Sequence, residues 1–108
     1  AAYYKKAVPT AVEENVPVAL PDRFVVSQNY PNPFNPVTKF NVTLPTMSDV
    51  EITVYNMLGQ RIKTLYHGKL DSGIHTFTFE GNDLSSGVYL YRVKTDGFTD
   101  VKRMILLK

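Results

Sequence analysis

The sequence predicts an all-β fold, an antiparallel seven-stranded β-sandwich of immunoglobulin-like architecture. Short runs rich in Val, Ile, Phe and Tyr alternate apolar with polar residues, which is the pattern of half-buried strands. Turn signals containing Gly, Pro, Asn and Asp recur about every 8 to 12 residues, a spacing typical of such sandwiches. No amphipathic helix pattern interrupts the series. Since the 108 residues include neither Cys nor Trp, the Cys–Trp–Cys signature of antibody domains is absent.

Residues 1–22 differ from the rest of the chain, because Pro9 and Pro17 interrupt a stretch in which neither strand nor helix periodicity lasts. We expect a linker or the tail of an upstream domain there, and a single β-domain over residues 23–108. Ala1 is not an initiator Met and no signal segment follows it, so we also expect the chain to be a piece of a longer protein.

Residues 30–38, YPNPFNPVT, are predicted to form the corner from which the long strands begin. Each of the three prolines in this stretch fixes its own φ near about −65° and pushes the preceding residue towards extended backbone. Two of them follow an asparagine, a residue that closes local turns. The corner is therefore predicted to be stiff, with Tyr30 and Phe34 packing as apolar lids on the strands.

Alternation places the apolar residues of each strand on one face, as with Phe40, Val42 and Leu44. In the fourth strand the apolar residues Ile62 and Leu65 are three positions apart, which predicts a β-bulge or strong twist. The expected strands are residues 24–28 (an edge strand), 37–44, 50–55, 61–66, 74–79, 88–94 and 98–107.

The connections are predicted from turn residues. Gly59, within the turn 56–60, is expected at positive φ, and residues 67–73 are expected to form a longer loop. Asp96-Gly97 is the strongest two-residue hairpin signal in the chain. The last strand is apolar on both faces near its end, so we expect it to lie buried.

Several functional classes find no support in the sequence. The net charge of +2 is too small to indicate nucleic acid or an anionic membrane as a partner. No apolar run approaches the ~20 residues of a transmembrane helix. Gly81 and Gly87 do not form a phosphate loop, and no cofactor is expected. The two histidines, His67 and His75, lie in no nucleophile motif, so no enzyme activity is expected.

Two binding alternatives stay open at this point. Glu80, Asn82 and Asp83, with Asp96 and Asp100 elsewhere, carry the oxygen ligands that Ca²⁺ prefers, although turns require the same residue types. The tyrosines could form an aromatic platform for a carbohydrate-binding accessory module of an extracellular enzyme, or the domain could anchor or space such an enzyme. Alternating strand positions, however, also favour packing of these rings in the core.

Six segments occur in register from residue 24 to residue 108: YPNPFNPVT, FNVTLP, VEITVYNMLGQRI, DSGIHTFTFEG, SSGVYLYRV and KRMILLK. Together they resemble the C-terminal sorting domain, type A, of the type IX secretion system. Within this family the sequence is similar to the subgroup that resembles the immunoglobulin-like domain of the flagellar hook-capping protein.

The resemblance implies a non-catalytic targeting domain that directs a larger passenger through the type IX system to the cell surface or medium by way of the periplasm. Its implied partners are outer-membrane translocon or shuttle proteins, the upstream passenger and a sortase-like peptidase that cleaves before about Phe24. We expect a monomer. Carried onto this sequence, the recognition residues are Tyr30, Pro31, Asn32 and Pro33 of the corner, Gly87, Val88 and Tyr89, and Lys102, Arg103 and Lys108.

Overall fold

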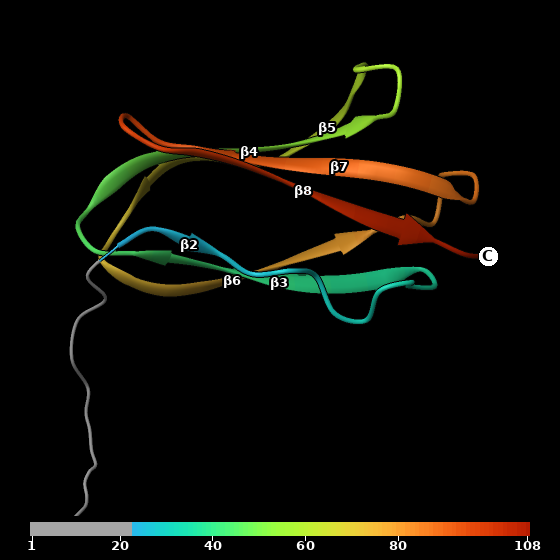
Figure 1. The fold of residues 1–108 in the computed structure, drawn as a ribbon, viewed down its shortest axis with the longest axis horizontal. Coiled ribbons are helices and arrows are strands. Elements are labelled where there is room, and N and C mark those ends of the chain that lie inside the picture. Colours follow the sequence, from blue (N-terminus) through green and yellow to red (C-terminus); the bar gives the residue numbers. More distant parts are fainter. Residues whose placement is uncertain (1–22) are drawn as a thin grey trace, which may run out of the picture.

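The computed structural model describes residues 23–108, which form two β-sheets packed face to face (Figure 1). Residues 1–22, for which a linker is predicted, lie outside the described residues. Every named element of the described part is a strand, so the all-β prediction is confirmed. The strands are β2 (Val25–Val26), β3 (Val37–Leu44), β4 (Ser48–Asn56), β5 (Arg61–Leu70), β6 (Gly73–Glu80), β7 (Gly87–Lys94) and β8 (Thr99–Leu106).

The seven strands divide into a smaller and a larger sheet. The smaller sheet has the order β2-β3-β6, the larger has β5-β4-β7-β8, and the paired strands run antiparallel. A constant-type immunoglobulin domain sets four strands, ABED, against three, CFG. Here the short turn between Asn56 and Arg61 keeps β5 beside β4, which produces a three-plus-four sandwich of the same general architecture.

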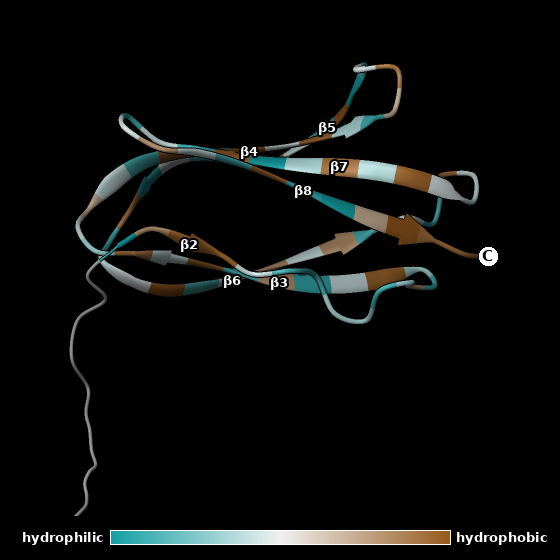
Figure 2. Ribbon diagram, in the orientation of Figure 1, coloured by the Kyte–Doolittle hydropathy of each residue, from teal (hydrophilic) through white to brown (hydrophobic). Residues whose placement is uncertain are grey.

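The core lies between the sheets and consists of the inward-facing residues that alternation predicts. Figure 2 shows hydrophobic and hydrophilic residues alternating along the strands. Its centre is a stack of Phe40 from β3 on Tyr91 from β7, with ring centroids 4.2 Å apart and planes inclined by 26°. Full burial of each aliphatic side chain around this stack stabilises the fold by about 1.5–3 kcal/mol. The largest fully buried side chains are Tyr91, Phe34, Phe40, Phe79, Leu44, Ile52, Met104, Leu106, Val42, Val50, Val54 and Val93.

The pairing of β4 with β5 contains two irregularities. The register shifts twice, because neither Leu65 nor Ile62 has a partner residue on β4. The predicted bulge is therefore confirmed at the two residues whose spacing indicated it. Both side chains thereby turn towards the core and pack against it. Gly59, in the turn between these strands, takes a φ of 82°, as predicted.

Two expected boundaries are wrong. Residues 67–70 continue β5 instead of forming a loop, because β4 begins at Ser48 and supplies backbone partners as far as Leu70. The first strand is limited to Val25–Val26, since its chain leaves β3 soon afterwards to enter the corner.

The expectation that the last strand is buried on both faces is also wrong. In a two-layer sandwich the outer face of β8 meets solvent, so Met104 and Leu106 are buried while Val101 and Leu107 are exposed. The Asp96-Gly97 hairpin before it is confirmed, with the amide of Thr95 donating to the carbonyl oxygen of Phe98 at 2.7 Å.

Candidate functional site

The proline corner is stabilised from within by a buried polar network. Asn29 is only 3% exposed, and its amide nitrogen donates to the carbonyl oxygen of Pro31 at 3.2 Å and to Thr38 Oγ1 at 3.0 Å. Thr38 Oγ1 in turn donates to the same carbonyl at 2.9 Å. A proline-rich segment lacks amide donors, so these side chains supply the hydrogen bonds that its carbonyl groups need. Its three X–Pro peptide bonds, at Pro31, Pro33 and Pro36, are cis.

The corner crosses from one sheet to the other. At its start, Tyr30 and Lys39 of β3 exchange two backbone hydrogen bonds, at 2.8 and 3.1 Å. Four residues later, Phe34 donates its amide to the carbonyl oxygen of Ile105 at 2.9 Å and accepts from the amide of Leu107 at 3.0 Å. This second contact is a parallel bridge on the outer edge of β8. The corner therefore joins the two sheets along one side of the sandwich.

Side chains reinforce the contact with β8. Asn32 Oδ1 accepts from the amide of Ile105 at 3.0 Å, and Gln28 Nε2 donates to the carbonyl oxygen of Arg103 at 2.6 Å. Together with the bridge at Phe34, they occupy outward-facing backbone groups of β8 between residues 103 and 107. Because these groups are occupied, that part of the edge does not offer itself for strand addition.

Phe34 anchors the corner in the core. Its side chain is 1% exposed and meets Phe79 edge to face, with ring centroids 6.0 Å apart. Tyr30 behaves differently from its prediction as an apolar lid, because its side chain is 82% exposed and points into solvent. Only one of the two expected lids is therefore a packing residue.

The start of β7 pairs with the inner edge of the same strand. Gly87, Val88 and Tyr89 lie opposite Leu106, Ile105 and Met104 in turn. Beyond β8, the amide of Lys108 donates to Ser86 Oγ, and its side chain donates to the carbonyl oxygen of Asn82. The structure thus brings the three segments predicted for recognition, 30–33, 87–89 and 102–108, together around β8.

These residues differ in what they present to a partner. Tyr30, Pro31, Asn32, Pro33, Arg103 and Lys108 are exposed. Lys102 is half-buried and forms an ion pair with Asp100, with Nζ and Oδ2 3.8 Å apart, while Gly87 and Val88 are half-buried. Tyr89 is 8% exposed, and its hydroxyl donates to the carbonyl oxygen of Ser85. Its side chain therefore supports the strand and is not presented at the surface.

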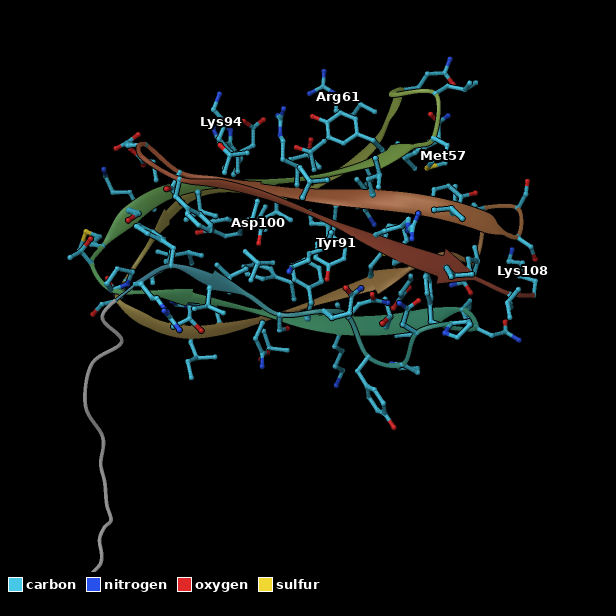
Figure 3. The ribbon with its side chains drawn as sticks, viewed as in Figure 1. Met57, Arg61, Tyr91, Lys94, Asp100 and Lys108 are labelled. Carbon is cyan, nitrogen blue, oxygen red and sulfur yellow. The ribbon has the colours of Figure 1, made fainter. Side chains whose placement is uncertain are left out.

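One buried phenol links the core to the corner. The Tyr91 hydroxyl lies between the sheets (Figure 3) and donates to the carbonyl oxygen of Ser27 at 2.7 Å. Burial raises the pKa of Tyr91 well above its usual range, and the negative charge of Asp100 raises it further. The neutral, donating phenol is thus the form that the fold favours.

The catalytic and metal-binding alternatives lack converging side chains. His75 Nε2 lies 2.8 Å from the carbonyl oxygen of Asp71, and His67 is exposed on β5 beside a shallow depression of about 250 Å³. Within residues 23–108 no group of three or more His, Cys, Asp or Glu side chains is placed to hold a metal ion. Asp96 and Asp100 lie in the β7–β8 hairpin and its strand, whereas Glu80 ends β6 in the opposite sheet.

The described part of the chain also lacks the arrangement of exposed rings that a carbohydrate-binding platform needs. Tyr89 and Tyr91 are buried, and Tyr66 packs against Phe77 with its hydroxyl donating to the carbonyl oxygen of Lys69. Tyr55 lies beneath Arg92, which leaves Tyr30 standing alone. Coplanar exposed rings are therefore not found among the tyrosines of residues 23–108.

Sequence reasoning missed Gln28, Asn29 and Thr38, which hold the corner in place. Asn29 precedes the first proline of the corner by two residues, a position from which an Asn side chain reaches a nearby carbonyl. That spacing was a usable signal for Asn29. The bond of Gln28 to Arg103 spans 75 positions and had no local signal.

Together the fold and the site define an immunoglobulin-like recognition module, because its distinctive surface consists of a proline corner locked onto a basic edge strand. Residues 28–107 match the model of the secretion system C-terminal sorting domain family. This match covers most of the chain, so the chain belongs to that family. It confirms the predicted sorting domain of type IX secretion: a targeting module, itself not catalytic, whose function implies an upstream passenger and export to the cell surface or extracellular space.

Two solved structures resemble this chain, and the first of them supports the fold. Dimeric latent PorU from Porphyromonas gingivalis aligns with a TM-score of 0.58 and 18% identity, over 91% of this chain and 10% of PorU. PorZ, a surface component of the type-IX secretion system of the same organism, aligns with a TM-score of 0.49 and 19% identity, over 81% of this chain and 12% of PorZ. The chain thus spans about a tenth of either protein. The search of curated proteins found no match. Residues 23–108 contain no helix long and apolar enough to cross a membrane.

Proposed function

We propose that residues 23–108 are read in the folded state by outer-membrane translocon or shuttle proteins of the type IX system. In this proposal residues 1–22 are the linker to the passenger, and the passenger reaches the outer membrane by way of the periplasm. A sortase-like peptidase then cleaves in the linker before about Phe24. The family match supports the sorting role, and the neighbouring structure of PorZ comes from a component of that same secretion system.

The surface proposed for recognition comprises the exposed residues of the corner together with β8 and the start of β7. The observation that carries this assignment is the parallel bridge between Phe34 and Leu106, which joins the corner to β8. Segments far apart in the chain thereby form one rigid surface that combines prolines, an aromatic side chain and positive charge. Rigidity favours recognition because little conformational entropy is lost on binding. The assigned residues are Tyr30, Pro31, Asn32, Pro33, Gly87, Val88, Tyr89, Lys102, Arg103 and Lys108, of which Tyr89 supports the surface from within because its side chain is buried.

The finer classification is also a proposal. Type A and the subgroup similar to the hook-capping immunoglobulin-like domain are supported by the order of the six segments in the sequence. The three-plus-four division of strands is compatible with that assignment. A monomer fits the bonding of β8, whose outer edge between residues 103 and 107 is already occupied by the corner.

A secretion assay tests the proposal. Residues 22–108 are fused behind a signal peptide and a fluorescent reporter in a bacterium that has the type IX system. We expect the fusion to reach the surface or medium. Deleting residues 102–108 is too severe a test, because it removes the fully buried Met104 and Leu106. Tyr30→Ser combined with Lys108→Ser is the sharper change, since both side chains are exposed.

The matched control is Ile74→Ser, which removes another exposed apolar side chain outside the proposed surface. We expect the double variant to remain in the periplasm while the control is exported, with both showing the thermal unfolding of the parent domain. Export of a folded double variant at the parent level contradicts the recognition surface. Retention of the folded parent fusion contradicts the sorting function in that host.

A further inference from the structure

The turn between β4 and β5 presents two large apolar side chains to solvent. Met57 is 60% exposed and Leu58 is 83% exposed. The hairpin rises from the larger sheet on the side that faces away from the smaller one (Figure 1), and Met57 and Arg61 both lie on that side (Figure 3). These two adjacent apolar side chains contribute nothing to the core, so they are free to contact another molecule.

The turn is rigid, so this exposure belongs to the native conformation. Asn56 Oδ1 accepts from the amides of Leu58 at 2.9 Å and Gln60 at 3.0 Å, and its Nδ2 donates to Gln60 Oε1 at 2.7 Å. Two backbone hydrogen bonds of 3.0 Å also close the turn: the amide of Gly59 donates to the carbonyl oxygen of Asn56, and the amide of Asn56 donates to the carbonyl oxygen of Gln60. Gly59 has a positive φ, which the turn requires. A turn fixed in this way binds with a small loss of conformational entropy.

Uncompensated arginines lie next to the turn. Arg61 is paired across the strands with Tyr55, and the guanidinium of Arg92 lies over the Tyr55 ring, 5.3 Å from its centroid. The two salt bridges within residues 23–108 join Lys69 to Asp49 and Lys102 to Asp100, so neither arginine is paired. Arg92 Nε and Thr53 Oγ1, opposite each other on neighbouring strands, are buried without a hydrogen-bond partner. These two atoms are too buried to reach a partner, but the unpaired positive charges of the exposed Arg61 and of the half-buried Arg92 are complementary to carboxylates.

We propose that this hairpin surface, formed by Tyr55, Met57, Leu58, Arg61 and Arg92, docks on a protein that offers an apolar pocket bordered by Asp or Glu side chains. The two apolar side chains fill the pocket, and the arginines bind the carboxylates. Tyr and Arg dominate the binding energy of protein interfaces, and Met adapts to an apolar pocket. Arg92 lies on β7 beside β8, but Met57, Leu58 and Arg61 belong to the β4–β5 hairpin, which β7 separates from β8, so the apolar centre of this surface is distinct from the corner.

A protein pocket fits these observations better than a lipid surface does. Two side chains bury less apolar area than a single acyl chain, which by itself gives only marginal membrane binding. The Arg92 guanidinium also lies over the Tyr55 ring, and a guanidinium binds a planar carboxylate through paired hydrogen bonds. The proposal does not depend on which residues the translocon reads, although the sorting function supplies the setting in which the partner is met.

Site-specific photocrosslinking in the exporting cell tests this inference. A photoreactive amino acid replaces Met57 in the full fusion with its passenger, and the same group at Ile74 on the opposite sheet is the matched control. We expect a discrete protein adduct from position 57 alone, with the crosslinked peptide lining an apolar pocket that contains Asp or Glu. Leu58→Ser should lower the adduct yield about tenfold or more, as expected when a buried Leu is lost from an interface. Arg61→Glu, a change at an exposed position, should lower it similarly.

Three results would overturn the proposal: equal adducts from positions 57 and 74, an adduct that Arg61→Glu leaves unchanged, or a partner peptide without acidic neighbours. Flotation with vesicles of phosphatidylcholine and phosphatidylglycerol in equal parts tests the lipid alternative. Leu58-dependent flotation with these vesicles would also overturn it. Export is measured in parallel on the same fusions. Loss of export with an unchanged adduct would concern the sorting function, whereas loss of the adduct with unchanged export would concern the hairpin surface.

Discussion

The proline corner and the β4–β5 turn are both rigid connections, but their rigidity has opposite origins. The turn is held by hydrogen bonds from Asn56 to residues at most four positions away. The corner is held by bonds from Asn32 and Gln28 to β8, 73 and 75 positions away, and by the burial of Phe34. Local bonds fix the shape of a turn wherever it stands, whereas distant bonds also fix its place on the protein. The corner should therefore respond to core mutations and the turn should not.

The largest effect is expected for Phe34→Ala. This change empties a fully buried site where the corner meets Phe79, and it should lower the free energy of unfolding by about 3–5 kcal/mol in urea denaturation. Tyr30→Ala in the same corner is the control, with an expected change within about 0.5 kcal/mol because its side chain is exposed. Equal losses in the two variants would show that the corner does not depend on its buried anchor.

Gly81→Ala tests the packing beneath the corner from the other direction. An added Cβ would lie 2.9 Å from Leu106 Cδ2 and 3.5 Å from Phe34 Cε2, so it should overpack the contact between the corner and β8. We expect a loss of about 1–3 kcal/mol in the free energy of unfolding. The control is Gly97→Ala, where no atom lies within 4 Å of the added Cβ. An unchanged midpoint for Gly81→Ala would mean that Leu106 moves aside at no cost.

Tyr91→Phe removes the phenol that donates to Ser27, and should cost about 1 kcal/mol near neutral pH. The folded state raises the pKa of Tyr91 above its unfolded value of about 10, so the stability linked to its proton is complete below that pH and falls as pH rises through it. The advantage of the native protein over the variant should therefore shrink at alkaline pH. Urea unfolding of both proteins on either side of pH ~10 measures this difference. A constant difference contradicts the linkage.

The smallest effect is expected for Asn56→Ala, which removes the local bonds of the β4–β5 turn. The free energy of unfolding should fall by about 1 kcal/mol or less, since the turn is exposed and the core is untouched. Hydrogen exchange gives the sharper readout: the amides of Leu58 and Gln60 should lose protection while those of Ile105 and Leu107 keep theirs. Equal changes at both places would remove the distinction between locally and distantly held connections.

The same distinction explains how much of the fold could be predicted from the sequence. Alternation located the long strands and their inward faces, and the spacing of Ile62 and Leu65 located the two register shifts. These features depend on neighbouring residues. The continuation of β5 to Leu70 was missed because it depends on where β4 begins, and the exposed outer face of β8 was missed because it depends on the number of layers.

For the candidate site, the sequence suggested three segments but not how they meet. The resemblance selected the corner, the start of β7 and β8, and the pairing of β7 with β8 follows from the Asp96-Gly97 hairpin. The parallel bridge of Phe34 with β8 leaves no mark in local periodicity, and Tyr30 was assigned to packing although it is exposed. The hairpin surface was missed for a different reason, because a turn predicted over residues 56–60 does not reveal that strand pairing brings Tyr55, Arg61 and Arg92 together beside it.

The bond between Asn32 and Ile105 makes the corner, near the start of the described domain, dependent on β8, the final strand of that domain. A chain that ends before residue 105 contains every residue of the corner and yet lacks the backbone on which it closes. Under the proposed function, a receptor that binds the closed corner would inspect both ends of the domain in a single contact and reject truncated chains without a separate check. Fusions ending at residue 104 should be retained even with an intact YPNPFNP segment; because they also lose the buried Leu106, thermal unfolding must show that their domain is folded, and export would refute this form of quality control.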